Sequence, residues 1–382
     1  TIVINGIVTD ENGQQVYQFD RRLPLNLRSE QVDSIRDRLM SFQDVFPLVP
    51  GKYKLSILLK NYVSKEFTSF EASISIPDRG LLMSPLVLAN RLTRSNQYRG
   101  LNKAFLLDDL QFVPSPRNDF VVGDRLYAVF QLWGLTPELK QSGSLNYEIV
   151  KENGDKVKSF SKKISDYQGS PVFYEEIYLE GWSPANYMLT VTLTDNNNNV
   201  VISQKENFFI SHLPALSRSW VMTQPVEGDN SAEVQHALGL QYWNRQDQAR
   251  AVKYLEAAYR LNPKEPAYAL DYCRLLLASR KYQEVIAVAG PFVSQEQNYD
   301  FLEILGQAAQ ALSQYEQAIN YYKQYLAHFG TNINILNAIG ECYSELGNAD
   351  EALYAWERSL QLEPNQEKIR AQIKTLKEKK KN

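Results

Sequence analysis

Cysteine and histidine are scarce in this chain. Only 2 of its 382 residues are cysteine and 3 are histidine. Cys273 and Cys342 lie far apart in helical sequence, and His212, His236 and His328 have no second ligand at the third or fourth residue that follows. The sequence therefore predicts no metal site and no cofactor. So few cysteines are compatible with either a reducing or an oxidising compartment.

Long apolar runs and an excess of positive charge are also absent. No run reaches the ~18 residues of a membrane span, and no cleavable leader is recognisable. The formal net charge is −3, whereas nucleic-acid binding normally needs a basic face. We therefore expect neither a membrane span nor a nucleic-acid partner. Because the first residue is Thr and not Met, we expect a processed chain or a piece of a longer one.

Catalytic motifs are missing as well. The chain contains no G-x-S-x-G, no Walker loop, no G-x-G-x-x-G and no H-E-x-x-H. Residues 195–206 carry oxygen ligands at calcium-loop spacing, but Val200 stands where that loop needs glycine and the flanks alternate as strands do. We interpret this segment as a hairpin turn. The sequence indicates that the chain is not an enzyme.

The C-terminal third contains a helical repeat. Small residues recur at steps of 34, 33 and 34 residues, at Gly239, Cys273, Gly306 and Gly340. A second set recurs at the same steps, at Ala251, Val285, Ala318 and Ala352. The run Leu238-Gly239-x-x-Tyr242, followed by Ala251 and Pro263, resembles the tetratricopeptide repeat, whose pattern is L-G-x-x-Y, then A-x-x-x-F, then P. The second repeat is degenerate, with Cys273 in place of glycine.

This resemblance implies an α-α superhelical solenoid over residues 231–366. Its four repeats would span 232–265, 266–298, 299–332 and 333–366, followed by a capping helix and basic tail over 367–382. No single repeat can bury its apolar face, so neighbouring repeats stack. We expect Ile369, Ile373 and Leu376 to cover the last repeat, and the Lys-rich end to be a solvated helix end.

The resemblance also implies a concave groove lined by the first helix of each repeat. The expected partner-binding residues are His236, Leu240, Trp243, Arg274, Gln307, Gln310, Asn337 and Glu341. Some members of this superfamily grip a C-terminal carboxylate with Lys, Asn and Arg. One Arg and no Lys at these positions argue against that activity, and the mixture of Trp, Leu and amides suits a protein or an extended peptide. The alternative is that these residues face solvent or the chain's own domains.

The N-terminal half contains a twinned sequence. "PGKYKLSILLKN" at 50–61 aligns with "PANYMLTVTLTD" at 184–195, and "ENGQQV" at 11–16 matches "ENGDKV" at 152–157. Asn-Gly between alternating runs is a strong hairpin signal because both residues tolerate positive φ. Two motifs in the same order predict two related β-sandwich modules of immunoglobulin or fibronectin type.

The second β module, residues 109–212, is predicted to be an immunoglobulin-like sandwich. Strands are expected near 124–133, 145–151, 156–164, 172–179, 186–194 and 200–210, with an edge strand at 109–114. Trp133 and Trp182 are candidates for its core. Residues 81–108 would connect the two β modules, and 213–230 would link the second to the solenoid.

The first β module, residues 1–80, is predicted to be incomplete. It has no counterpart of 124–133 and carries a helical insert at 29–42 instead. A sandwich that lacks a strand exposes unpaired backbone. We expect upstream sequence, part of 81–112, or a strand donated by a partner to cover it.

Three functions remain open at this point. The chain is a non-enzymatic scaffold with a protein-binding groove, the accessory part of an exported enzyme whose catalytic domain lies upstream, or a structural subunit of a large surface assembly. Phrases such as "SPLVLANRL" and "NDFVVGDRLYAVFQL" resemble secreted acidobacterial sandwich proteins, although their Gly-Trp-x-Thr-Asp motif is absent after Gly181-Trp182. That resemblance implies a periplasmic or cell-surface envelope protein.

Overall fold

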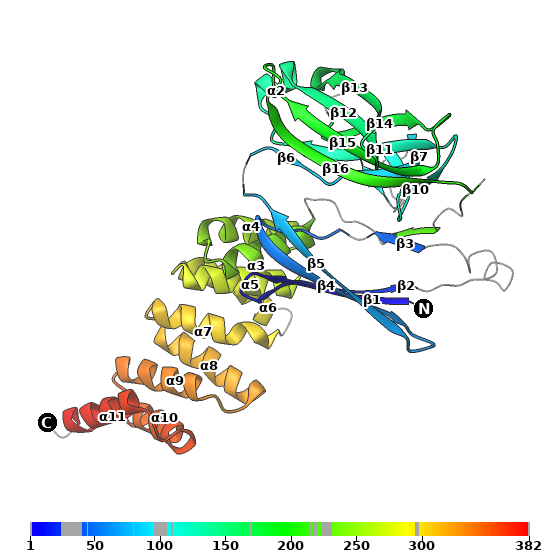
Figure 1. Ribbon diagram of the computed structural model, residues 1–382. Coiled ribbons are helices and arrows are strands. Elements are labelled where there is room, and N and C mark those ends of the chain that lie inside the picture. Colours follow the sequence, from blue (N-terminus) through cyan, green and yellow to red (C-terminus); the bar gives the residue numbers. More distant parts are fainter. Residues whose placement is uncertain are drawn as a thin grey trace. The chain divides into compact units, whose positions relative to one another are not determined.

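The computed structural model of the chain divides into two compact units, Thr1–Val226 and Glu227–Asn382. Strands form the first unit and helices form the second (Figure 1). The structure describes residues 2–23, 40–43, 45–78, 80–94, 105–107, 110–167, 170–213, 216, 220–223, 231–294 and 298–380.

The first β module is built on one antiparallel sheet. Its strands are β1 (Ile2–Asp10), β2 (Gln15–Leu23), β4 (Gly51–Asn61) and β5 (Phe67–Ile76), in the order β2-β1-β4-β5. The predicted Asn-Gly turn joins β1 to β2, with Gly13 at a φ of 78°. One face is apolar, and Phe42 and Phe46 pack there against Ile4 and Phe19.

The segment expected to be a linker returns to the first β module. Within it, β17 (Trp220–Thr223) pairs in parallel with β3 (Met40–Gln43), which contains Phe42. Residues 213–230 are therefore not only a linker, because part of them hydrogen-bonds to a strand far away in sequence. The helix expected at 29–42 lies mostly outside the described residues, and its last residues, 40–42, belong to β3.

The second β module is a sandwich of two sheets. One sheet has the order β10-β16-β15-β12-β13 and the other the order β14-β11-β7-β9-β8, with β6 paired to β11. The first comprises β10 (Asp119–Val121), β12 (Ser144–Lys151), β13 (Lys156–Lys163), β15 (Ala185–Thr194) and β16 (Val200–Ser211). The second comprises β6 (Leu82–Met83), β7 (Val87–Arg94), β8 (Leu106–Leu107), β9 (Leu110–Pro114), β11 (Arg125–Trp133) and β14 (Val172–Tyr178). A short helix, α2 (Pro137–Ser142), joins β11 to β12.

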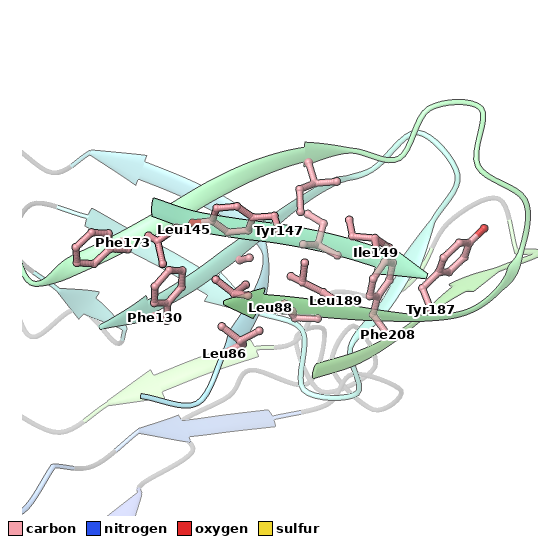
Figure 2. Close-up of a cluster of buried hydrophobic side chains, with 14 of the residues drawn as sticks. Leu86, Leu88, Phe130, Leu145, Tyr147, Ile149, Phe173, Tyr187, Leu189 and Phe208 are labelled. Atoms are coloured by element: carbon pink, nitrogen blue, oxygen red, sulfur yellow. The ribbon is translucent and has the colours of Figure 1, made fainter. Parts of the chain in front are cut away.

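The core of the sandwich lies between these sheets. Figure 2 shows Leu88 and Phe130 from one sheet facing Leu145 and Leu189 from the other. Trp182 packs on this core beside Tyr187, as expected. Trp133 was wrongly placed in the core: it ends β11 and is 40% exposed.

The segment expected to be a connector belongs to the sandwich. Strands β6, β7 and β8 all come from residues 81–108, and β7 pairs with β11 through Val87–Ala89. Leu86 and Leu88 are buried in the core. None of the described strands of 81–112 pairs with the sheet of the first β module, because these strands are hydrogen-bonded within the second. Strand β9 is also not at the edge, since β8 pairs with its outer side.

The two β modules share one four-stranded arrangement. The order β2-β1-β4-β5 repeats as β13-β12-β15-β16, and each module has its glutamate-asparagine-glycine hairpin at the same place. The twinned stretches form β4 and β15. In both, a buried tyrosine hydroxyl donates to the carbonyl four residues upstream: Tyr53 to Val49, and Tyr187 to Ser183. Such a tyrosine corner pins the turn that leads into the strand.

The comparison identifies what the first β module lacks. The second β module covers its four-stranded unit with the sheet that contains β11. Among the described residues of the first module, Phe42 of β3 and Phe46 pack on the corresponding face instead. The first module is thus a half-sandwich in the described part of the chain.

The second unit is a row of antiparallel helix pairs, which follow one another in chain order in Figure 1. They are α3 (Ala232–Asn244) with α4 (Gln248–Leu261), α5 (Pro266–Ala278) with α6 (Tyr282–Ser294), α7 (Leu302–Ala311) with α8 (Tyr315–Phe329), and α9 (Ile333–Glu345) with α10 (Ala349–Leu362). The last helix, α11 (Glu367–Lys379), buries Ile369 and Ile373 against Trp356. No helix among the described residues is long and apolar enough to cross a membrane.

Candidate functional site

The two helices of a pair fit together through a size match. A Cβ added at Gly239, Gly306 or Gly340 would come within 2.7, 2.3 and 2.3 Å of Leu255, Tyr322 and Trp356. Each of these large side chains lies 16 residues after its glycine, on the second helix of the pair. The glycine thus makes room mainly for a side chain, and the backbones approach each other there.

The degenerate second pair keeps the same match with the sizes exchanged. Cys273 stands in the glycine position, and Ala289 stands 16 residues later where the other pairs have a large residue. Both are fully buried. Burial raises the pKa of the Cys273 thiol to about 12, so it stays protonated and serves as a packing residue.

Polar contacts join neighbouring helix pairs along the groove. His236 Nε2 lies 2.9 Å from Asp271 Oδ2, and Arg274 Nη1 lies 2.9 Å from Asp271 Oδ1. The His236 ring also packs against Tyr268 at 4.7 Å. Burial raises the pKa of Asp271, but the bonds from His236 and Arg274 outweigh it and hold that pKa below its ordinary value. Asp271 is therefore charged at neutral pH and links α3 to α5.

A second polar link joins α7, α9 and α11. Gln310 Nε2 donates to Glu341 Oε2 at 3.3 Å, and Lys368 Nζ contacts Glu341 Oε1 at 2.9 Å. Asn337 Nδ2 donates to Gln366 Oε1 at 2.7 Å. Gln310, Asn337 and Glu341, which were expected to line the groove, thus stabilise the stacking of the array.

The eight expected partner-binding residues all lie on first helices of pairs. Leu240 and Trp243 are half-buried on α3, and Arg274 is exposed on α5. His236, Gln310, Asn337 and Glu341 are half-buried and carry the links described above, and Gln307 is bonded to Glu303 at 3.2 Å on α7. They are spread along the array and do not gather into one cluster, as suits an extended ligand.

The groove changes character along its length. Helices α3 and α5 contribute half-buried apolar side chains, namely Leu240, Trp243, Leu270 and Leu277. Helices α7 and α9 contain no Lys or Arg, and contribute Glu303, Glu341 and Glu345 together with the amides. The first half thus contributes more apolar side chains beside the contacts of Asp271, and the second half contributes more carboxylates, of which Glu341 is paired with Lys368.

A cavity of about 690 Å³ lies at the acidic end, between α9 and α11. Gln310, Glu341, Glu345, Lys368 and Gln372 line it. Within the described part of the chain, the buried acceptors Asn337 Oδ1 and Gln372 Oε1 have no hydrogen-bond partner. Gln372 lines the cavity and Asn337 does not, and both oxygens are themselves buried.

Residues 232–265 and 309–375 match models of the tetratricopeptide repeat. The C-terminal unit is an array of tetratricopeptide repeats. The matched segments cover the first repeat and most of the third and fourth with the capping helix. Neither lies in residues 1–212, so the resemblance of that half to secreted acidobacterial proteins stays a prediction.

Solved structures similar to the chain include "MamA 41-end from Desulfovibrio magneticus RS-1", at 16% identity and a TM-score of 0.38, covering 40% of this chain and 87% of that one. "MamA AMB-1 C2221" is 21% identical with a TM-score of 0.33, covering 35% and 79%. The "APC/C hetero-tetramer Cut9-Hcn1" is 19% identical with a TM-score of 0.35, covering 38% and 30%. The curated proteins contain no match.

The sequence did not predict the residues that contact the expected groove residues or line the cavity beside them. Asp271 and Lys368 were not expected in the site, and neither were Gln366 and Gln372. Asp271 lies three residues before Arg274, a spacing that places both on one helix face, so this link could have been found. The contacts across helix pairs carry no such local signal.

The sandwich holds another buried carboxylate. Glu175, only 5% exposed, accepts from Tyr167 at 2.7 Å and pairs with Lys162 at 2.7 Å, while the Tyr167 and Tyr147 hydroxyls lie 2.9 Å apart. Every member has a partner, and the link joins β14 of one sheet to β13 of the other. It stabilises the sandwich edge.

The described residues include no group of three metal-ligating side chains. In the segment with calcium-loop spacing, Asp195 accepts hydrogen bonds from the backbone of Asn197 and Asn199 in the β15–β16 turn.

Proposed function

We propose that this chain is a non-enzymatic scaffold of the bacterial envelope or cell surface. Its tetratricopeptide repeats would hold an extended segment of a partner protein. The observation that carries this proposal is the groove itself, whose expected lining residues and their polar partners are distributed over five helices. Solenoids of this kind present long concave binding surfaces.

The chemistry of the groove suggests the chemistry of the partner. An apolar stretch on α3 and α5 suits apolar side chains, and the Lys- and Arg-free helices α7 and α9 suit lysine or arginine. The partner segment would therefore combine apolar residues at one end with basic residues at the other.

Selection from a random peptide library against the whole chain tests this. We expect enriched peptides with an apolar end and a basic end. Trp243→Ala and Glu303→Gln should each weaken binding about tenfold, whereas Tyr354→Ala, a 69% exposed position on α10, should not. Peptides without this pattern, or binding lost only in the Tyr354 variant, would overturn the assignment.

Export of the chain rests on the sequence resemblance of its β modules. Fractionation of the cells that produce the protein tests it separately, with an antibody against the chain. We expect the protein in the envelope or surface fraction. Recovery with cytosolic markers would contradict the proposal without affecting the groove.

A further inference from the structure

The edge strands of this chain differ in how strongly their sequences discourage pairing with another chain. Strand β13, at the edge of the second β module, has four lysines in eight residues, and β2 carries three consecutive charged residues and a bulge in its pairing with β1. Charged side chains and bulges discourage edge strands from pairing with other chains. Strand β5 has no bulge and only one charged residue.

Strand β5 is long, regular and nearly uncharged. All ten residues from Phe67 to Ile76 pair with β4 or lie in register with it, without a bulge. Glu71 is its one charged residue, and Lys54 neutralises it at 2.9 Å. Phe67 and Phe70 are 73% and 60% exposed. No described strand pairs with the outer edge of β5, which ends the sheet beside β4 (Figure 1).

We propose that β5 pairs antiparallel with β5 of a second copy of this chain, joining two four-stranded sheets into one. This inference goes beyond the groove function and does not rest on it. A twofold axis perpendicular to the sheet would relate the copies, so that each residue faces a residue on the same side of the sheet.

The sequence of β5 selects one register. With Ala72 facing Ala72 of the second copy, residues 68–76 of both chains pair, and Phe70 faces Ile74 on the apolar side. Aromatic and β-branched residues opposite each other stabilise a sheet. Centring the pairing on Glu71 would put two carboxylates directly opposite, which is destabilising. Centring it on Phe70 or Ser73 pairs fewer residues.

The complementarity of β5 with itself is the reason for proposing a second copy of the chain as the partner of this edge. On the other side of the sheet, Ser69 would face Ser75, and Glu71 would face Ser73, so no like charges meet. A charged partner strand would find a single, already neutralised carboxylate along this edge. The strand is thus better matched to itself than to a charged segment.

Light scattering after size exclusion tests the proposal with the whole chain. We expect the wild-type mass to correspond to two chains. S69K/S75K sets lysines opposite lysines and should weaken dimerisation at least tenfold, whereas S69K/S75E sets lysine opposite glutamate and should keep the dimer. Ser69 and Ser75 are both exposed, so circular dichroism should show an unchanged fold.

Cysteine cross-linking tests the register. Directly opposite residues have Cα atoms about 4.5–5.5 Å apart, within disulfide range. Ala72→Cys should therefore form a covalent dimer on oxidation. Ser73→Cys is the matched control, because its counterpart is a diagonal neighbour about 7–8 Å away. Cys273 and Cys342 are buried and should not interfere.

Two results would overturn the proposal. One is a wild-type chain that stays monomeric at every concentration. A chain whose β5 pairs with a strand of another protein, and not with a second copy, would count as the same result. The other is a dimer that S69K/S75K leaves intact. Either result would leave the peptide selection against the groove unaffected.

Discussion

At the residue scale, single buried tyrosines hold equivalent turns in the two β modules. Tyr53 and Tyr187 occupy the same place in the twinned stretches and bond to the carbonyl four residues back. The twin was visible in sequence, but the function of its tyrosine was not. The hydroxyl explains why tyrosine, and not phenylalanine, stands at both positions.

Tyr187→Phe should lower the free energy of unfolding by about 1 kcal/mol, because it removes the bond to Ser183 and leaves the carbonyl without that donor. Chemical denaturation measures the change. Tyr178→Phe is the control, since this side chain is 52% exposed. It should lower the free energy of unfolding by only a few tenths of the amount expected for Tyr187→Phe. Equal costs for the two variants would argue against a tyrosine corner.

Gly306→Ala should destabilise the repeat array by about 1–3 kcal/mol, because its Cβ would overlap the Tyr322 ring. Gly290 lies in α6 with no atom within 4 Å of an added Cβ. Gly290→Ala should therefore stabilise the chain by up to about 1 kcal/mol through helix propensity. Thermal unfolding distinguishes the two, and similar shifts for both would refute the size match.

At the scale of elements, contacts between helix pairs hold the array together. Two lysines of α11 and the lysine that follows the helix are paired with acidic residues: Lys368 with Glu341, Lys377 with Glu357, and Lys380 with Asp350. The basic end of the chain is thus more than a solvated helix end. Such exposed pairs contribute little individually, so burial of Ile369 and Ile373 accounts for most of the stabilisation by α11.

Ending the chain after Gln366 should lower the free energy of unfolding of the array by several kcal/mol, at about 1.5–3 kcal/mol for each of Ile369 and Ile373. It would also uncover Trp356, which is 2% exposed. Tryptophan fluorescence and thermal unfolding measure this. Lys368→Ala in the whole chain should cost under about 1 kcal/mol. If Lys368→Ala lowered the free energy of unfolding more than the truncation does, burial of Ile369 and Ile373 would not be the main stabilising contribution of α11.

Asp271 should make the link between α3 and α5 sensitive to acid. Its pKa in the folded chain lies below the ordinary value of 3.8, so its contribution is present above that value and is lost as the pH falls through the folded pKa. Asp271→Asn should cost about 1 kcal/mol at neutral pH, and the difference from wild type should shrink in acid. Denaturation at a series of pH values measures it. Asp300→Asn, at an exposed position, should change nothing, and a pH-independent cost of Asp271→Asn would contradict the prediction.

At the scale of the whole molecule, the chain consists of two compact units. Each has its own core, and the division falls between Val226 and Glu227. A separate core is what allows a domain to unfold by itself. The first unit thus contains the half-sandwich, with the edge strand β5, and the sandwich, and the second unit contains the array with its proposed groove.

Calorimetry of the whole chain should show separate unfolding transitions. Gly306→Ala should shift the transition of the repeat array, and Tyr187→Phe should shift that of the sandwich, by about 2–4 °C for each kcal/mol. Neither variant should move the other's transition. A single transition moved by both variants would show that the units unfold together.

The sequence was sufficient wherever the pattern is local. Helix pairs were predicted because glycine, alanine and large residues recur within one repeat, and the strands from 124 to 210 because apolar alternation and Asn-Gly turns act over a few residues. The distribution of the eight groove residues over first helices also follows from that period. Local patterns did not reveal that Trp133 is exposed, because its burial depends on what lies across the end of β11.

What the sequence by itself determined is the repeat array, six strands of the second β module between residues 124 and 210, and the twin relationship of β4 and β15. Only the tertiary structure decided that residues 81–108 complete the sandwich, that β17 returns to β3, and that Asp271 and Lys368 link helix pairs. The reason is physical. Turns, helix caps and periodic faces depend on residues a few positions apart, whereas strand partners and links between repeats are selected by the unpaired edges and charges that remain after the local elements have formed.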